Sequence, residues 1–147
     1  MHGNVYITEG EKEIIDTFPF QRLHRLRQLA GAEYVYPGAN HTRIEHTVGV
    51  LYLEGKVAEN PNIAQRVSED EAEIVRIAAL LHDVGHGPFS HVFEYLLDKE
   101  LGKTHEDMTL WIITNSELKE ILNKIGYNPR EIGKLAIGTL QKPKKLS

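Results

Sequence analysis

The sequence of 147 residues contains no cysteine. This absence excludes disulfide scaffolds, thiol catalysis, iron–sulfur clusters and every zinc site that uses cysteine. Metal ligands, if the protein has them, must be histidines and carboxylates. A chain of this length buries ~70% of the surface that its unfolded form exposes, so it needs no metal to hold a core. We therefore expect a bound metal to serve chemistry.

Long hydrophobic runs and an excess of basic residues are also missing. The longest apolar stretch spans about Val48 to Leu53, far short of the ~20 residues of a membrane-spanning helix. The N-terminus has no basic segment followed by an apolar one, so no secretory signal is visible. The 17 Lys and Arg against 21 Asp and Glu give a net charge of -4, which argues against a nucleic-acid partner. We expect a cytoplasmic protein without a membrane partner.

The sequence instead contains a series of helical patterns. Capping boxes such as Thr8 with Glu11 and Ser68 with Glu71 mark helix starts, and apolar residues recur at helical spacing. The patterns predict helices over residues 10–17, 20–29, 42–58, 68–81, 89–101, 104–114, 116–125 and 128–140. Near 33–36 the aromatic and β-branched residues allow at most a short extended or β segment, because Pro37 and Gly38 stop it. We predict an all-α helical bundle.

Histidines gather where the most apolar helix ends. His82 and Asp83 close the segment 68–81, and Gly85, Gly87 and Pro88 follow directly. A single His-Asp pair is most often a solvent-facing helix cap. Here, however, four of the eight histidines fall between His82 and His105, and clustering of this kind favours a site.

An earlier segment adds to this cluster. His46 follows Arg43 by three positions, so both side chains project from one helix face. Nitrogen and oxygen ligands without sulfur suit a divalent ion, manganese, iron, nickel, magnesium or zinc, and predict metal-assisted hydrolysis. Neighbouring helical residues point roughly 100° apart, so His82 and Asp83 can share an ion only at a distorted helix end, which Gly85 supplies.

These residues resemble the HD-domain superfamily of metal-dependent phosphohydrolases, and within it the deoxynucleoside triphosphate triphosphohydrolase branch. The most specific part of the resemblance is the run from Leu81 to His91. Shorter matching segments occur in the family's order: Met1–Gly3, Ile14–Thr17, Phe20–Leu23, Gln28–Leu29, Tyr36–Ala39, Thr42–His46 and Thr104–Glu106. The resemblance implies an HD-domain helical bundle that cleaves a nucleotide between the α-phosphate and the sugar and releases nucleoside and triphosphate.

The resemblance also implies roles for individual residues. The implied metal ligands are His46, His82 and Asp83. Arg43 and His91 would contact phosphate, and Gln28 and Leu29 would lie against the sugar. His86, Glu94 and His105 would line the reacting centre, with His105 and Glu94 as the pair for proton transfer. The implied partners are a nucleotide substrate and further copies of the chain in a homo-oligomer, in which Asp16 and Gln21 would read an activating nucleotide.

One ligand of the family has no match in this sequence. The fourth metal ligand of the family is an aspartate on a later helix, and the unassigned Asp98 and Asp107 stand outside that context. We therefore expect an HD domain over residues 1–141 that stops before the last metal-binding aspartate and a basic flexible end over 142–147. Because three ligands lack the second carboxylate, we also expect metal affinity and turnover to be weak or absent in this chain.

Three other functions are open at this point. The same site could hydrolyse nucleoside monophosphates or phosphodiesters. The histidines at 82 and 86 could be a degenerate HExxH zinc protease helix, although the glycines and Pro88 argue against it. The chain could also be a non-catalytic helical module that binds nucleotide through its arginines, although an arginine run such as Arg22, Arg25 and Arg27 is more often a solvated face.

Overall fold

The computed structural model describes residues 4–139, apart from the side chain of His91, so the expected flexible end at 142–147 lies outside the described residues. Within this range the structure contains helices and no β-strand, so the all-α prediction is confirmed. The α-helices are α1 (Glu9–Ile15), α2 (Phe18–Gln21), α3 (Arg43–Ala58), α4 (Pro61–Ala64), α5 (Glu69–Leu81), α6 (His91–Leu101), α7 (His105–Asn115), α8 (Glu117–Lys124) and α9 (Pro129–Ala136). Two short 3-10 helices are η1 (Arg22–Arg25) and η2 (Ala32–Tyr34).

The helix starts follow the local sequence. Capping boxes are formed at Thr8, Thr42, Ser68 and Thr104, where each cap side chain and a carboxylate three residues later satisfy backbone N–H groups. Asp107 is the carboxylate at the start of α7, which is the helix-cap role that its sequence context favours. These local bonds fix where α3, α5 and α7 begin, and the site residues on α3 and α7 follow within the first turns.

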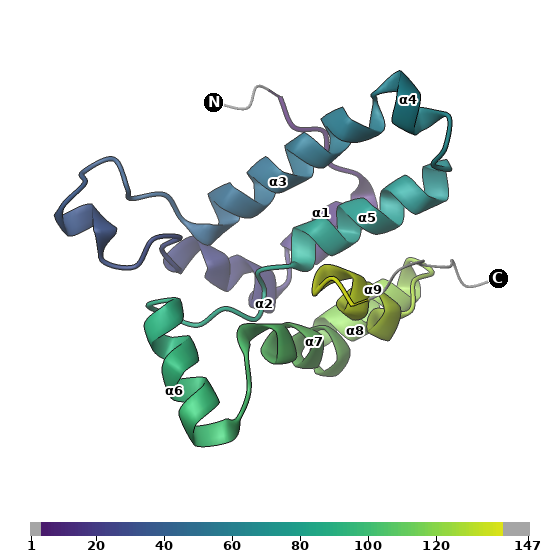
Figure 1. Ribbon diagram of the computed structural model, residues 1–147. Coiled ribbons are helices and arrows are strands. Elements are labelled where there is room, and N and C mark those ends of the chain that lie inside the picture. Colours follow the sequence, from purple (N-terminus) through teal and green to yellow (C-terminus); the bar gives the residue numbers. More distant parts are fainter. Residues whose placement is uncertain (1–3, 140–147) are drawn as a thin grey trace.

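Helix α5 lies at the centre of the bundle. It packs against α3 on one side and α9 on the other, and α7 packs against α8 and α9 (Figure 1). Its buried residues are Ile74, Ile77, Ala78, Leu80 and Leu81. They join one core cluster with buried residues of the other helices, among them Ile14, Phe20, Leu51, Ile113 and Ile132. The mostly apolar second half of α5, from Ile74 to Leu81, agrees with this central place.

The predicted helix over 20–29 is wrong in its second half. The chain forms α2 and η1 and then becomes extended at Leu26, with φ -106 and ψ 118. The reason is tertiary: Arg27 pairs with Thr42 in an isolated antiparallel bridge, and the Leu26 carbonyl accepts the Arg43 N–H at 2.8 Å. This pairing ties the start of α3 to the end of η1 and overrides the local helical preference.

The segments near 33–36 and 128–140 also differ from expectation. Residues Ala32–Tyr34 form η2 rather than an extended segment, after Gly31 with a φ of 74. The last helix ends at Ala136, and Gly138 adopts a φ of 72 that stops a helix. Among residues 4–139, no helix has the length and apolar character needed to cross a membrane.

Candidate metal centre

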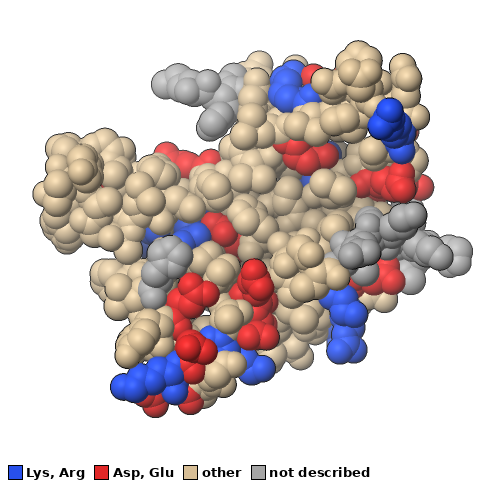
Figure 2. Space-filling model, in the orientation of Figure 1, with Lys and Arg blue, Asp and Glu red and all other residues tan. Residues whose placement is uncertain are grey.

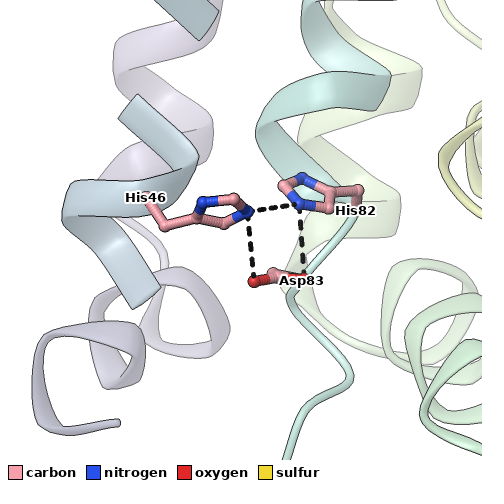
Figure 3. Close-up of side chains that lie close together, drawn as sticks. All are labelled: His46, His82 and Asp83. Atoms are coloured by element: carbon pink, nitrogen blue, oxygen red, sulfur yellow. Dashed lines mark hydrogen bonds and ion pairs between the residues drawn. The ribbon is translucent and has the colours of Figure 1, made fainter. Parts of the chain in front are cut away.

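Three side chains from two helices converge on one point. His46 lies in the first turn of α3, and His82 and Asp83 follow the last residue of α5 (Figure 3). One potential ligand atom from each of the three lies within 4.8 Å of those of the other two. The His82 Nε2 is 3.3 Å from the His46 Nε2 and 3.3 Å from the Asp83 Oδ1. This cluster has the residue types and the spacing of a site for a divalent cation.

The helix end makes this convergence possible. Regular α-helical bonding stops at Leu81, and the chain continues in tight turns in which the Val84 N–H bonds the Leu81 carbonyl and the His86 N–H bonds the Asp83 carbonyl. The turn brings the side chains of His82 and Asp83 to one side, as the sequence predicts for a distorted helix end. A continuous HExxH helix is incompatible with this backbone, which excludes the zinc protease interpretation.

The hydrogen bonds of His82 prepare it to bind a cation. Its Nδ1 lies 2.6 Å from the Ala79 carbonyl, which only accepts, so Nδ1 carries the proton. In this tautomer the lone pair of Nε2 faces the cluster, as in metal-binding histidines. Burial lowers the pKa of His46, although the Asp83 carboxylate opposes the effect, so this ring is neutral at pH 7.

Asp83 is held by a buried arginine. Arg43 is 3% exposed; its Nη1 donates to the Asp83 Oδ2 at 2.6 Å and its Nη2 donates to the Ser90 Oγ at 2.7 Å. Arg43 therefore orients the carboxylate in this structure, and the phosphate contact expected of it stays a prediction. Ser90 has a φ of 45 and precedes α6, so the strained turn is tied to the cluster through Arg43.

A second pair of titratable side chains lies beside the cluster. The His105 Nδ1 is 2.5 Å from the Glu94 Oε1, a bond that joins α7 to α6. The His86 ring stacks on the His105 ring with centroids 4.0 Å apart, and the His86 Nε2 is 3.5 Å from the Asp83 Oδ1. The three residues expected at a reacting centre are thus brought together next to the three expected metal ligands.

His86 makes stability depend on pH. Burial, reinforced by the Arg43 charge, lowers the pKa of His86 from 6.5 to about 4. The unfolded chain then binds a proton at higher pH than the folded chain, so unfolding becomes easier as pH falls from 7 toward 4. We expect the Tm of the protein in EDTA to fall between pH 7.5 and pH 5, and to fall less in His86→Gln. Equal pH slopes for the two proteins would contradict this.

The expected sugar-binding residues line a cavity next to Ser90. A cavity of about 320 Å³ is bounded by Gln28, Leu29, Ala30, Ala32, Phe89, Ser90 and Val92. The Gln28 Oε1 is buried and has no hydrogen-bond partner in the structure. Because a buried unpaired polar atom costs about 1–3 kcal/mol, this oxygen is suited to accept a bond from a ligand.

The other residues singled out in the sequence do not join the cluster of His46, His82 and Asp83. Asp16 ends α1 and is exposed, and the Gln21 Nε2 donates to the Ile15 carbonyl at 2.8 Å. His91 begins α6, but its side chain is outside the described part of the structure. Asp98 is exposed on α6 and does not join the His46, His82 and Asp83 cluster.

Sequence reasoning missed two residues that hold the site. Arg22, expected on a solvated face, is half-buried and bonds the carbonyls of Val84 and His86, at 2.8 Å for the latter. The Thr109 hydroxyl accepts the Gly85 N–H at 3.0 Å and donates to the His82 carbonyl at 3.3 Å. Arg22 lies in the segment Phe20–Leu23 that resembles the family, but that resemblance assigned it no role, and Thr109 belongs to no motif in the sequence.

Comparison with known proteins supports this reading of the cluster. The model of the HD domain family matches residues 43–144. A relative named deoxynucleoside triphosphate triphosphohydrolase SAMHD1 homolog, from Dictyostelium discoideum, is 41% identical over 82% of this chain and 25% of its own length. Human deoxynucleoside triphosphate triphosphohydrolase SAMHD1 is 37% identical over 97% of this chain and 25% of its own length. An uncharacterised protein of Methanocaldococcus jannaschii is 39% identical over 84% of this chain and 27% of its own length.

A solved structure shares the fold. The crystal structure of a hypothetical protein from Aquifex aeolicus superposes with a TM-score of 0.78 and 36% identity, over 94% of this chain and 36% of that chain. The present chain therefore spans about a quarter of the length of these curated relatives. The matched residues 43–144 include His46, His82 and Asp83, and the helical bundle is consistent with the match. The chain belongs to the HD-domain family.

Proposed function

We propose that this chain forms the catalytic region of a metal-dependent phosphohydrolase that converts a deoxynucleoside triphosphate into nucleoside and triphosphate. The observation that carries the proposal is the adjacency of two groups of side chains. The ligand atoms of His46, His82 and Asp83 lie within 4.8 Å of one another, and His105 bonds Glu94 at 2.5 Å beside them. The names of the relatives support the triphosphate substrate.

His46, His82 and Asp83 would hold the divalent ion, whose identity the donor set leaves open among manganese, iron, nickel, magnesium and zinc. When bound, such an ion supplies positive charge against phosphate oxygens. In the proposed reaction, water attacks the α-phosphorus and the bond from this phosphorus to the sugar 5′-oxygen breaks. His105 donates a proton to that leaving oxygen, and Glu94 orients and stabilises the protonated ring. The proton of the attacking water passes to solvent.

The cavity beside Ser90 fits the sugar end of this substrate. Its wall combines apolar side chains with the unpaired Gln28 Oε1, which can accept a bond from a sugar hydroxyl. Leu29 is 48% exposed beside it and would exclude a bulkier sugar by lack of room. Arg43 and His91 remain the proposed phosphate contacts.

Product analysis tests the proposal. Incubation of the protein at high concentration with manganese and a deoxynucleoside triphosphate is expected to release triphosphate and nucleoside in equal amounts, and EDTA is expected to stop the release. The release is expected to be slow, because no aspartate of this sequence matches the family's fourth metal ligand. His105→Gln is expected to reduce the rate about 10²–10⁴-fold, the range of a lost general acid. Its matched control is His24→Gln, because His24 is exposed on η1 and is not part of the His46, His82 and Asp83 cluster.

The other outcomes identify the competing functions. Orthophosphate as the sole product would indicate a phosphohydrolase of another substrate class and overturn the proposal. Nucleotide that raises the Tm equally with and without EDTA, and that is never hydrolysed, would indicate a non-catalytic binding module, because a ligand stabilises only the states that it binds.

The surface supports the expected homo-oligomer. Tyr34, Val35 and Tyr36 are 90%, 72% and 67% exposed in the loop that leads to α3. Figure 2 shows this loop as a protruding lobe that carries almost no charged atoms on the visible face. Exposed apolar patches of this kind mark protein contact sites. An activating nucleotide at Asp16 and Gln21 remains part of the same proposal.

A further inference from the structure

The turn that carries Asp83 and His86 has backbone groups that the helix cannot satisfy. Carbonyl groups at and beyond the end of a helix lack the N–H four residues later and need other donors. The Leu81 and Asp83 carbonyls are bonded within the turn itself. The carbonyls of Val84 and His86 point instead toward η1, from which a single side chain reaches both of them.

That side chain is Arg22. Its Nη1 donates to the His86 carbonyl at 2.8 Å, and its Nη2 donates to the Val84 carbonyl. These two bonds bridge more than 60 residues of sequence, with separations of 64 and 62. The planar guanidinium presents two donors in a fixed geometry, so the two bonds together set the position and the orientation of the turn around Gly85.

The turn is also held by α7. The Gly85 N–H, between the two carbonyls that Arg22 binds, donates to the Thr109 hydroxyl at 3.0 Å. A Cβ added at Gly85 would lie 2.2 Å from the Thr109 N, so the backbones of the turn and α7 are in direct contact. The turn is thus bonded both to Arg22 of η1 and to Thr109 of α7, so loss of the Arg22 bonds removes one of its two attachments.

Placing a guanidinium here is costly. Burial, and then the charge of Arg43, lower the pKa of Arg22. Both bonds that Arg22 makes to the turn go to neutral carbonyls rather than to a carboxylate. An apolar side chain could fill the same space without the desolvation penalty. The two fixed donors are the feature that an apolar residue could not supply.

We propose that Arg22 is a positioning residue of the candidate metal centre: by bonding the Val84 and His86 carbonyls it fixes the turn that presents Asp83 and His86. Arg22 touches neither the substrate nor the ion in this proposal. The expected effect on metal affinity rests on the proposed metal site. The effect of Arg22 on the backbone of the turn can be measured in the metal-free protein.

The first experiment measures manganese binding by wild type, Arg22→Ala and Arg22→Lys, with the free ion quantified by its paramagnetic resonance signal. We expect the Kd of Arg22→Ala to rise about 10–100-fold, the range for residues that orient metal ligands. Arg22→Lys is expected to recover only part of the loss, because an ammonium group lacks the planar pair of donors.

Arg76 provides the matched control. It is another partly buried arginine, with a side chain that is 20% exposed, and it bonds Glu11 at 2.8 Å and the Tyr6 carbonyl at 3.1 Å. It contacts no residue of the metal centre through these bonds. Arg76→Ala is expected to lower the Tm while the manganese Kd stays within twofold of wild type. Equal Kd values for Arg22→Ala and Arg76→Ala would overturn the proposal.

The second experiment needs no metal. Amide hydrogen exchange at Gly85 and the carbonyl ¹³C shifts of Val84 and His86 are recorded in EDTA. Loss of Arg22 is expected to speed exchange at Gly85 and to move both carbonyl signals, with Arg22→Lys giving a smaller change. If Arg22→Ala fails to fold, Arg22→Lys carries both experiments.

The two experiments separate the two proposals. Manganese binding that is undetectable in wild type would contradict the metal site, and the metal-free spectra would still decide the role of Arg22. Unchanged exchange and carbonyl signals in a folded Arg22 variant would contradict the positioning role, whatever the metal affinity.

Discussion

Asp83→Ala is expected to abolish metal binding and to lower the free energy of unfolding by about 3–5 kcal/mol, the range for breaking a buried ion pair. Asp83 is 6% exposed and its carboxylate accepts the Arg43 Nη1 at 2.6 Å. Removing the carboxylate leaves the buried Arg43, which is 3% exposed, without its charged partner. Urea unfolding in EDTA measures the stability loss, and manganese titration measures the binding loss.

Asp83→Asn separates the two effects. The amide oxygen has the shape of a carboxylate oxygen and can still accept from Arg43, so most of the stability lost in Asp83→Ala should be retained. The amide carries no negative charge and is a poorer cation ligand, so manganese binding should remain lost. If Asp83→Asn binds manganese as tightly as wild type, Asp83 is not a ligand. If Asp83→Ala is as stable as wild type, the buried pair contributes nothing.

Gly85→Ala is expected to destabilise the fold by about 3 kcal/mol, the upper part of the usual range for overpacking. The added Cβ would lie 2.2 Å from the Thr109 N, 2.3 Å from the His105 carbonyl oxygen and 2.4 Å from the Thr109 Oγ1. Two of these three atoms are backbone, so the start of α7 must move away from the turn. This shift displaces His105 from Glu94, and we expect phosphohydrolase activity to fall together with stability.

Gly10→Ala is the control for the loss of a glycine. A Cβ at Gly10 would meet only the Ile125 side chain, at 3.6 Å, which is an ordinary contact. Gly10 lies within α1, where alanine is favoured by about 1 kcal/mol. Thermal unfolding should therefore show Gly10→Ala to be as stable as wild type or slightly more stable. A wild-type Tm for Gly85→Ala would show that α7 and the turn are not in contact.

The part of the candidate site at the end of α5 was predictable, because the potential ligands and the glycines that interrupt the helix are neighbours in the sequence. His82 and Asp83 stand at the end of an apolar segment, and the glycines after them interrupt the helix, so a distorted helix end that carries both side chains follows from the order of residues. The fold class follows from capping boxes and helical periodicity in the same way, because both act within a few residues.

Long-range pairing was not predictable. The helix expected over 20–29 ends early because Arg27 pairs with Thr42, and this pairing leaves no mark in the local pattern. Arg22 and Arg25 look alike in sequence, yet Arg22 is half-buried against the turn that follows α5 and Arg25 is exposed. Arg22 is half-buried because the carbonyls of Val84 and His86, more than 60 residues away in sequence, lie within reach of its guanidinium.

The sequence by itself determined the all-α architecture, the central place of α5 and the residue types available to bind a cation. Each of these depends on spacing along the chain or on the chemistry of single side chains. Only the tertiary structure decided that His46 lies beside His82 and Asp83 and that Arg43 bonds Asp83. It likewise decided that Arg22 and Thr109 both bond the turn after α5. These contacts join segments far apart in the sequence, so they arise only when α3, η1 and α7 pack around the end of α5.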